Sequence, residues 1–473
     1  TLSFIPSLGP FNEKRVLQIG ALVAVAGGLL MSRSIRRQWL TTFCRLPLAA
    51  RWGLSGVLGL GLLSSALAPA PFYAFLEVGH FVLLFAAAGV VASEVRSAPS
   101  ETQWAFLGIV AVSGGLYAMY FGFGYVAYLS IPGIDPWPEW GTNYANIRLF
   151  NHYQTWTLPL FAGVMLSIPK RWRFGKGIMF GVTSLWWALV LVSNVRGTVV
   201  AMGIASVGVA LLFCSQAKKW LVVQGLALVA GTALFYILFS EGSSLAEGAP
   251  PVTEKFGQGS PGRLQSWTAC LDMMWADPIL GAGPMHFAWL PYQSTGRASP
   301  HSALMQWLAE WGVPSTLIMV GLAIWGGWKW ISQEQNSETT DVVKSKGLSV
   351  ALVASVLAGA AHSMVSGLIA APLSQMLLVF VGGWIWGRYR FARERRTHFE
   401  TRSKLWSHSI LCVVAAGSMF VLGASLQDLT DTEERREAFL ETVDRNRLSP
   451  RYWTQGYIEI RDPSVVEQIP ERK

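Results

Sequence analysis

Residues 218–240 read KKWLVVQGLALVAGTALFYILFS, an uninterrupted apolar stretch that follows two lysines. A helix needs about 20 apolar residues to cross a hydrocarbon core of about 30 Å, and this stretch has that length. Its apolar residues show no two-residue alternation, which disfavours the strands of an outer-membrane barrel. The stretch therefore predicts a membrane-spanning α-helix.

Similar stretches recur along the whole chain of 473 residues. Charged residues make up only 14% of the sequence, whereas a soluble domain has about a quarter. We predict an all-α polytopic membrane protein with about 12 transmembrane helices. The predicted spans are 16–32, 53–69, 72–92, 104–126, 149–168, 177–195, 198–215, 220–240, 312–330, 347–370, 374–387 and 409–426.

Basic residues gather in four segments between the predicted spans, at 33–52, 169–176, 216–219 and 388–408. If the spans are counted in order, all four segments fall on one side, which the positive-inside rule identifies as the cytoplasm. The net charge of +9 then reflects topology, and nucleic acid is not an expected partner. This pattern predicts a multi-pass protein of the bacterial inner membrane with its N-terminus outside. A missing upstream span or a processed leader before Thr1 would change that end of the topology.

The long segment 241–311 is the main expected feature of the outer, periplasmic side, because a loop of that length in a helical bundle is usually functional. We expect helices from Arg263 to Trp275, ended by Asp277-Pro278, and from His301 to Trp311. The expected domains are a transmembrane bundle at 1–240, a periplasmic loop with active-site helices at 241–311, transmembrane helices at 312–426 and a short charged periplasmic tail at 427–473. The tail is expected to be an appendage with a helix at 431–445.

Three arginines are expected on the outer side, next to apolar helix ends: Arg148, Arg196 and Arg263. A guanidinium group binds phosphate oxygens through two parallel hydrogen bonds, so three that converge would hold a diphosphate. Arg196 lies in a turn so short that its charge must sit at the membrane surface or slightly inside it, where a charge needs a partner. For any single arginine, contact with lipid headgroups or with a carboxylate is the alternative interpretation.

Histidines and glutamates supply the remaining candidates. His301 begins the second expected loop helix, where a neutral imidazole could accept a proton from an attacking hydroxyl, although a capping or surface role is the alternative. His362 lies in the tenth predicted span. Glu77 and His80 share one face of the third span, and we interpret them as a structural hydrogen-bonded pair.

The sequence contains no HExxH or DxD motif, no phosphate-binding glycine loop on the cytoplasmic side and no CxxC spacing among its four cysteines. We therefore expect no metal ion, no other cofactor and no ATP-driven chemistry.

Two segments of the long loop carry recognisable motifs. Residues 277–283 follow the pattern D-P-hydrophobic-hydrophobic-G-x-G, and residues 301–312 follow H-[NS]-x-x-x-Q-x-x-x-E-x-G. Together with Arg263 and Trp267, these segments resemble the O-antigen ligase and polymerase superfamily. The resemblance covers about fifty residues strongly, and elsewhere it extends to hydropathy and the turn at 195–198.

The resemblance implies a GT-C-like bundle and metal-independent transfer of a glycan from undecaprenyl diphosphate to an acceptor hydroxyl at the periplasmic face. It also implies that Arg196 and Arg263 hold the diphosphate and that His301 activates or orients the acceptor. We add Arg148 from charge and topology. The secondary candidates are His152, His362 and Glu310.

Several activities share these motifs. Ligation of O-antigen to lipid A-core ranks first, and polymerisation of O-antigen units and transfer of glycans to protein hydroxyls remain alternatives. A transporter or flippase of lipid-linked glycans is a more distant alternative, since it would predict inverted repeats and charges near the membrane midplane. The charged candidates cluster at the outer surface instead.

Overall fold

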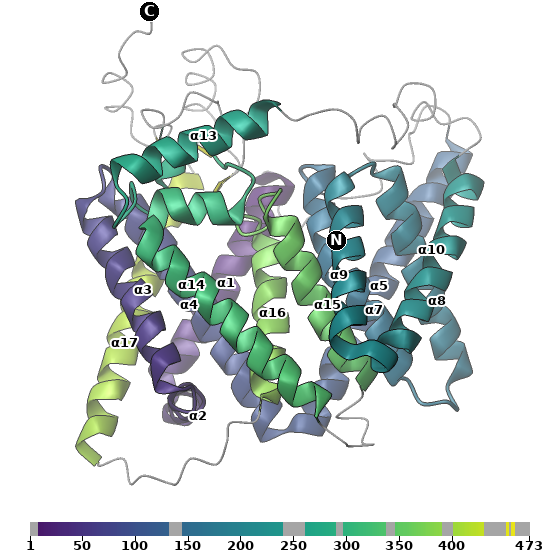
Figure 1. The fold of residues 1–473 in the computed structure, drawn as a ribbon, viewed down its shortest axis with the longest axis horizontal. Helices are drawn as coiled ribbons and strands as arrows, with labels where there is room; N and C mark the ends of the chain where they lie inside the picture. The colour runs from purple at the N-terminus through teal and green to yellow at the C-terminus, as the bar shows by residue number, and fades with distance from the viewer. Residues whose placement is uncertain are drawn as a thin grey trace, which may run out of the picture. The chain divides into compact units, whose positions relative to one another are not determined.

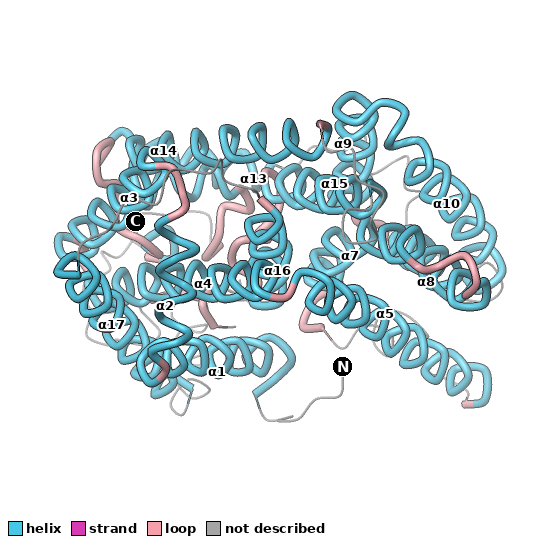
Figure 2. Tube along the Cα trace, turned by 90° about the horizontal axis from the view of Figure 1, so that it is seen from below, coloured by secondary structure: helices cyan, strands magenta, loops and turns pink. Residues whose placement is uncertain are grey.

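The computed structural model describes residues 8–131, 144–239, 261–289, 297–336, 346–389, 401–429, 451–453 and 456–458. Every regular element within these ranges is a helix, as the tube in Figure 2 shows. The all-α prediction is confirmed for this part of the chain. The helix expected at 431–445 lies outside the described residues.

Each of the twelve predicted spans overlaps a helix (Figure 1), although the span predicted at 347–370 extends past the helix that ends at Ser363. The helices are α1 (Gly9–Met31), α2 (Arg33–Cys44), α3 (Leu48–Leu67), α4 (Pro71–Ser97), α5 (Pro99–Ser130), α7 (Ile147–Ser167), α8 (Arg173–Val192), α9 (Arg196–Phe213), α10 (Lys218–Phe239), α13 (Pro261–Ala276), α14 (Ala303–Gln335), α15 (Lys346–Ser363), α16 (Pro372–Arg388) and α17 (Thr401–Ala424). Short 3-10 helices are η2 (Cys214–Ala217), η3 (His286–Ala288) and η6 (Ser425–Leu429).

Length and composition support fewer membrane crossings than there are helices. Among the described residues, eight helical stretches are long and apolar enough to cross a membrane, or nine if the bent pair α2 and α3 counts as one span. The chain is thus a multi-pass membrane protein, but the count of twelve is not confirmed. Helix α16 has only 17 residues, and α9 to α10 count as one stretch of 44 residues although η2 separates them.

The basic segment at 33–52, expected as a linker, contains helix α2, which meets α3 at a bend of 111°. Trp39 anchors α2, because its indole donates to the Ala86 carbonyl at 2.9 Å and lies against Gly89 of α4. Arg33 and Arg37 are exposed. This arrangement is typical of an amphipathic helix that lies in a membrane interface.

The helices form two compact units. Unit 1 contains α5, α7 to α10, α15 and the end of α14 from Trp330 onward. Its helices approach closely at glycines: a Cβ on Gly163 of α7 would lie 2.6 Å from the Cβ of Ala351 in α15. Similarly, a Cβ on Gly231 of α10 would lie 2.6 Å from the Cβ of Trp187 in α8. Small residues at such contacts are typical of packing between membrane helices.

Unit 2 contains α1 to α4, α13, most of α14, α16 and α17. Figure 1 shows α13 running across the ends of the other unit 2 helices instead of parallel to them. The tail residues 451–453 and 456–458 are buried in the core of this unit, where Trp453 is fully enclosed. The expectation that the tail is a mere appendage is wrong for these residues.

Candidate functional site

Helix α13 carries Arg263 in its first turn, and it ends at Ala276, just before the predicted stop at Asp277-Pro278. The inward face of the helix presents Cys270 and Met273, which pack against Phe287 and Ala309. Burial raises the pKa of the Cys270 thiol far above its usual range, so the thiol stays neutral. Arg263 is half-buried.

The turn at 277–284 is docked on α14 by its backbone. The N–H groups of Ala282 and Gly283 donate to the carbonyls of Ala309 and Glu310 at 2.9 and 3.2 Å, and Val313 donates to Pro278 at 2.9 Å. Helix α14 breaks at Gly312, whose φ is 75°, and a helix end leaves carbonyls that need new donors. The turn supplies these donors, so the two motif segments fold as one structural element.

His301 lies two residues before the start of α14, and its φ of 55° places it in the left-handed region. The expected helix from His301 to Trp311 therefore begins at Ala303 and continues beyond the break into the predicted span at 312–330. The indole of Trp267 donates to the carbonyl of Pro300 at 3.1 Å. Since Trp267 lies one helical turn after Arg263, this bond brings the Arg263 face of α13 beside His301.

Arg297 is a basic residue of this region that the sequence reasoning missed. A Cβ added to Gly262 would lie 2.8 Å from the Cζ of Arg297, so the Arg297 guanidinium covers the backbone next to Arg263. Arg263 lies in the first turn of α13, and Arg297, which precedes His301 in the chain, covers the backbone at the start of that helix. Arg297 also lies in the loop predicted to be periplasmic, but it is not part of either motif segment.

Glu310, a secondary candidate, belongs to a buried ionic cluster. One of its oxygens accepts from the N–H of Phe287 at 3.1 Å, and the other lies 2.6 Å from the guanidinium of Arg451. The same Arg451 nitrogen lies 2.8 Å from both carboxylate oxygens of Glu77. Burial disfavours the charge on Arg451, but Glu310 and Glu77 outweigh this effect and raise its pKa, so Arg451 is charged.

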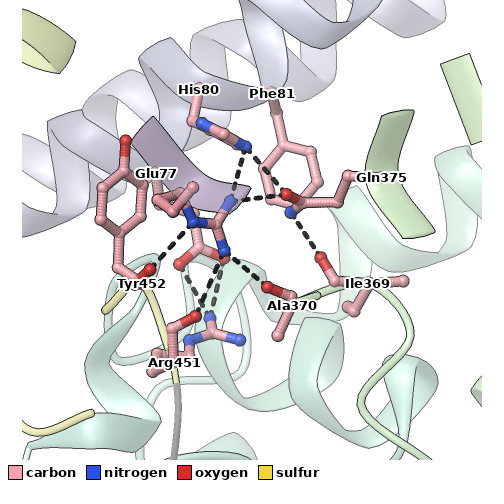
Figure 3. A pocket seen from close by; sticks show the side chains of 9 residues that line it. Glu77, His80, Phe81, Ile369, Ala370, Gln375, Arg451 and Tyr452 are labelled. Atoms are coloured by element: carbon pink, nitrogen blue, oxygen red, sulfur yellow. Dashed lines mark hydrogen bonds and ion pairs between the residues drawn. The ribbon is translucent and has the colours of Figure 1, made fainter. Parts of the chain in front are cut away.

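Arg15 also belongs to this cluster, and Figure 3 labels its neighbours His80, Gln375 and Tyr452. It donates to the carbonyl of Tyr452 at 2.9 Å and to Gln375 at 2.7 Å, and it lies 3.3 Å from His80. Glu77 and His80 therefore have different partners, and the interpretation that they form a pair is wrong. Both partners are arginines that are remote in the sequence.

The cavity among these side chains has a volume of about 20 Å³. That is room for about one water molecule. The space among these side chains is smaller than a sugar or a diphosphate.

Unit 1 contains Arg148, Arg196, His152 and His362. Arg196 is the first residue of α9, after a turn in which Asn194 has a φ of 50°. A Cβ on Gly197 would lie 2.7 Å from the Cδ2 of His362, so the turn rests directly on that imidazole. Arg148 is exposed in the first turn of α7.

His152 and His362 belong to a buried polar network between α7, α9 and α15. The Nδ1 of His362 lies 2.8 Å from the hydroxyl of Thr155, which lies 3.1 Å from the hydroxyl of Thr198. The Nε2 of His152 lies 2.7 Å from the hydroxyl of Ser366, and the two imidazole rings are 5.3 Å apart. Since Thr198 follows Arg196 in the first turn of α9, this network fixes the start of that helix.

Residues 180–320 match the family described as O-antigen ligase. The match includes Arg196, Arg263, His301 and Glu310, whereas Arg148, His152 and His362 lie outside it. No match was found among curated proteins.

Proposed function

We propose, from the membership of this chain in the O-antigen ligase and polymerase superfamily, that it moves a glycan from undecaprenyl diphosphate to an acceptor hydroxyl. Membership implies a glycosyltransferase or ligase type of enzyme that acts on a lipid-linked glycan and a lipid acceptor. The specific reaction proposed is ligation of O-antigen to lipid A-core at the periplasmic face of the inner membrane. The observation that carries the proposal is the hydrogen bond from Trp267 to Pro300, which joins the helix that carries Arg263 to the residue before His301.

The proposed reaction needs charge neutralisation and one base. The acceptor oxygen forms a bond to the anomeric carbon of the glycan, and the bond between that carbon and the phosphate oxygen breaks. The electron pair leaves with the diphosphate, and the acceptor proton moves to His301. Arg263 binds diphosphate oxygens, so the departing negative charge is stabilised. Arg196 and Arg148 belong to unit 1, and their roles at the diphosphate stay predictions from the resemblance and from charge.

The secondary candidates take positioning roles in this scheme. His362 supports the turn that presents Arg196, since it lies against Gly197 and is bonded to Thr155. His152 lies beside the His362 ring and is bonded to Ser366. Glu310 holds the turn at 277–287 against α14. None of these three side chains needs to contact the substrate.

The experiment that tests the proposal is transfer by the purified protein from undecaprenyl-diphosphate-linked glycan, followed by gel shift. The acceptors are lipid A-core, a second undecaprenyl-linked glycan and an acceptor protein, each in a separate reaction. Product with lipid A-core is the expected result. Product with only the lipid-linked glycan would identify a polymerase, and product with only the protein would identify a protein oligosaccharyltransferase.

Two variants test the site. Arg263→Ala is expected to lower transfer at least tenfold, because a charge-assisted hydrogen bond contributes about 1.5–3 kcal/mol. His301→Asn keeps a residue that tolerates the left-handed backbone but removes the base, so a loss of 100-fold or more is expected. Gln265→Ala, on the exposed face of α13, is the matched control. Normal transfer by both variants would overturn the site assignment, and a separate assay of glycan flipping identifies a transporter.

A further inference from the structure

The buried tail segment, residues 451–453 and 456–458, lies against the candidate loop of unit 2. Trp453 and Ile458 pack in one core cluster with Met285, Ala288 and Ala298. The N–H of Ile458 also donates to the carbonyl of Ala288 at 3.2 Å. The tail thus contacts both the residues that follow the turn at 277–284 and the short segment that leads to His301.

Arg451 adds an ionic contact to this packing. Its guanidinium binds Glu310 and Glu77 at 2.6 and 2.8 Å, and only 3% of its side chain is exposed. Glu310 in turn accepts from the N–H of Phe287, in the 3-10 helix η3. Arg451 therefore fixes the residues on both sides of His301: Glu310 in α14 directly, and the segment around Ala298 through Tyr452 and Trp453.

The tail is itself held in place. Arg15 of α1 donates to the carbonyl of Tyr452 at 2.9 Å and to that of Ala370 at 2.6 Å. The tail is therefore anchored to α1 and to the residues before α16, and it transmits that anchorage to the loop.

We infer that Arg451 is a positioning residue for the transfer reaction, and that the tail residues 451–453 and 456–458 hold the His301 loop in its productive geometry. This inference rests on the proposed function. The Arg451 guanidinium contacts Glu310 and Glu77, so it acts through Glu310 and, by way of Tyr452 and Trp453, through the core around Ala298. A displacement of about 1 Å at a reacting group can lower a rate about 100-fold.

The test compares three variants of the full chain. Arg451→Met removes the charge and keeps most of the volume. Arg451→Lys keeps the charge but replaces the guanidinium, of which one nitrogen contacts both carboxylates. Arg451→Met/Glu310→Gln removes one of the carboxylates left without a counter-charge. Arg96→Met is the matched control, since Arg96 is in the same unit and donates to the carbonyls of Trp386 and Tyr389, away from the loop. The readouts are kcat, donor KM, thermal unfolding, and amide exchange of peptides that cover 285–289 and 298–310.

Arg451→Met is expected to lower kcat at least tenfold with donor KM within about twofold, and to accelerate amide exchange in both peptides. Arg451→Lys is expected to be intermediate, and Arg96→Met unchanged in all but thermal unfolding. The double variant is expected to regain unfolding temperature while kcat stays low, because the contact between Arg451 and Glu310 is not restored. A purely structural role predicts instead that kcat recovers together with stability.

Wild-type kcat in a folded Arg451→Met protein, or recovery of kcat in the double variant, overturns the inference. If Arg451→Met does not fold, the lysine and double variants decide by the same comparison. Amide exchange needs no substrate. If the wild-type chain transfers no glycan to any acceptor, the proposed function fails. Unchanged amide exchange in the loop peptides of Arg451→Met would separately show that Arg451 does not hold the loop.

Discussion

Arg297 is the residue whose role follows most directly from its surroundings, because its guanidinium covers Gly262 beside Arg263. We expect Arg297→Ala to raise donor KM about tenfold, since a charge-assisted hydrogen bond contributes about 1.5–3 kcal/mol and 1.4 kcal/mol is tenfold in affinity. The measurement is donor KM at saturating acceptor. The donor KM of Arg297→Lys should lie between those of the wild type and of Arg297→Ala. An alanine variant with unchanged donor KM would show that Arg297 does not bind the donor.

The surroundings of His286 predict how the stability of the protein depends on pH. Its Nε2 accepts from the N–H of Ala70 at 3.0 Å, its Nδ1 lies 2.9 Å from the Pro284 carbonyl, and burial lowers its pKa to about 4. In the unfolded chain the imidazole is protonated near pH 6.5, whereas in the folded chain it stays neutral until the pH falls to about 4. Stability is therefore fully present above pH 6.5 and is lost as pH falls towards 4, with an upper limit of about 3 kcal/mol.

Thermal unfolding of the detergent-solubilised protein between pH 7 and pH 5 tests this prediction. His286→Gln, which keeps a neutral polar side chain, should unfold at a lower temperature at pH 7 but with a smaller dependence on pH. Equal pH dependence in the two proteins would mean that His286 is not the titrating group.

At the scale of residues, the sequence identified what the motifs contain but not what each residue does. Arg263 and His301 could be singled out because charge and position predict their chemistry. Glu310 belongs to the same motif as His301. Its partners, however, are Arg451 and the N–H of Phe287, which are remote in the chain. Only the three-dimensional fold brings Arg451 to Glu77 and Glu310, and no local pattern encodes that contact.

Among the elements, the docked turn at 277–284 depends on glycine at 281 and 312. Gly312 has φ 75° and ψ 170°, and a Cβ there would lie 2.9 Å from the N of Gly281 and still closer to the Ile279 carbonyl oxygen. Gly312→Ala should therefore cost about 1–3 kcal/mol in backbone strain, with a further loss from displaced hydrogen bonds.

The measurement is the unfolding temperature, which should fall markedly in Gly312→Ala. Gly321→Ala in the same helix is the control, because a Cβ at that position meets nothing within 4 Å and alanine favours helix. A Gly312→Ala protein as stable as the Gly321→Ala protein would contradict the described break in α14.

Hydropathy located the helices but not their interruptions. It separated the expected loop helix at 301–311 from the span at 312–330, whereas α14 runs through both and bends at Gly312. It also passed over α2, since that helix is amphipathic and shorter than a span. Such features depend on packing partners, which for α2 include Gly89 of α4.

For the whole molecule, the proposed topology places Cys44 and Cys214 in the cytoplasm and α13 in the periplasm. Both cysteines are exposed, so a membrane-impermeant maleimide should label neither in intact spheroplasts and both after permeabilisation. In a Cys44→Ser/Cys214→Ser background, Thr268→Cys on the exposed face of α13 should label in intact spheroplasts. The opposite pattern would invert the topology.

The ion pair between Arg451 and Glu310 joins residues 141 positions apart. The ribosome thus makes Glu77 and Glu310 long before it makes the arginine that neutralises them. Until then, two carboxylates and an apolar core lacking Tyr452 and Trp453 stand in a partly assembled bundle. Incomplete packing of this kind exposes a nascent chain to chaperones and proteases. A chain that stalls before residue 451 therefore lacks the counter-charge and the aromatic side chains that complete this core.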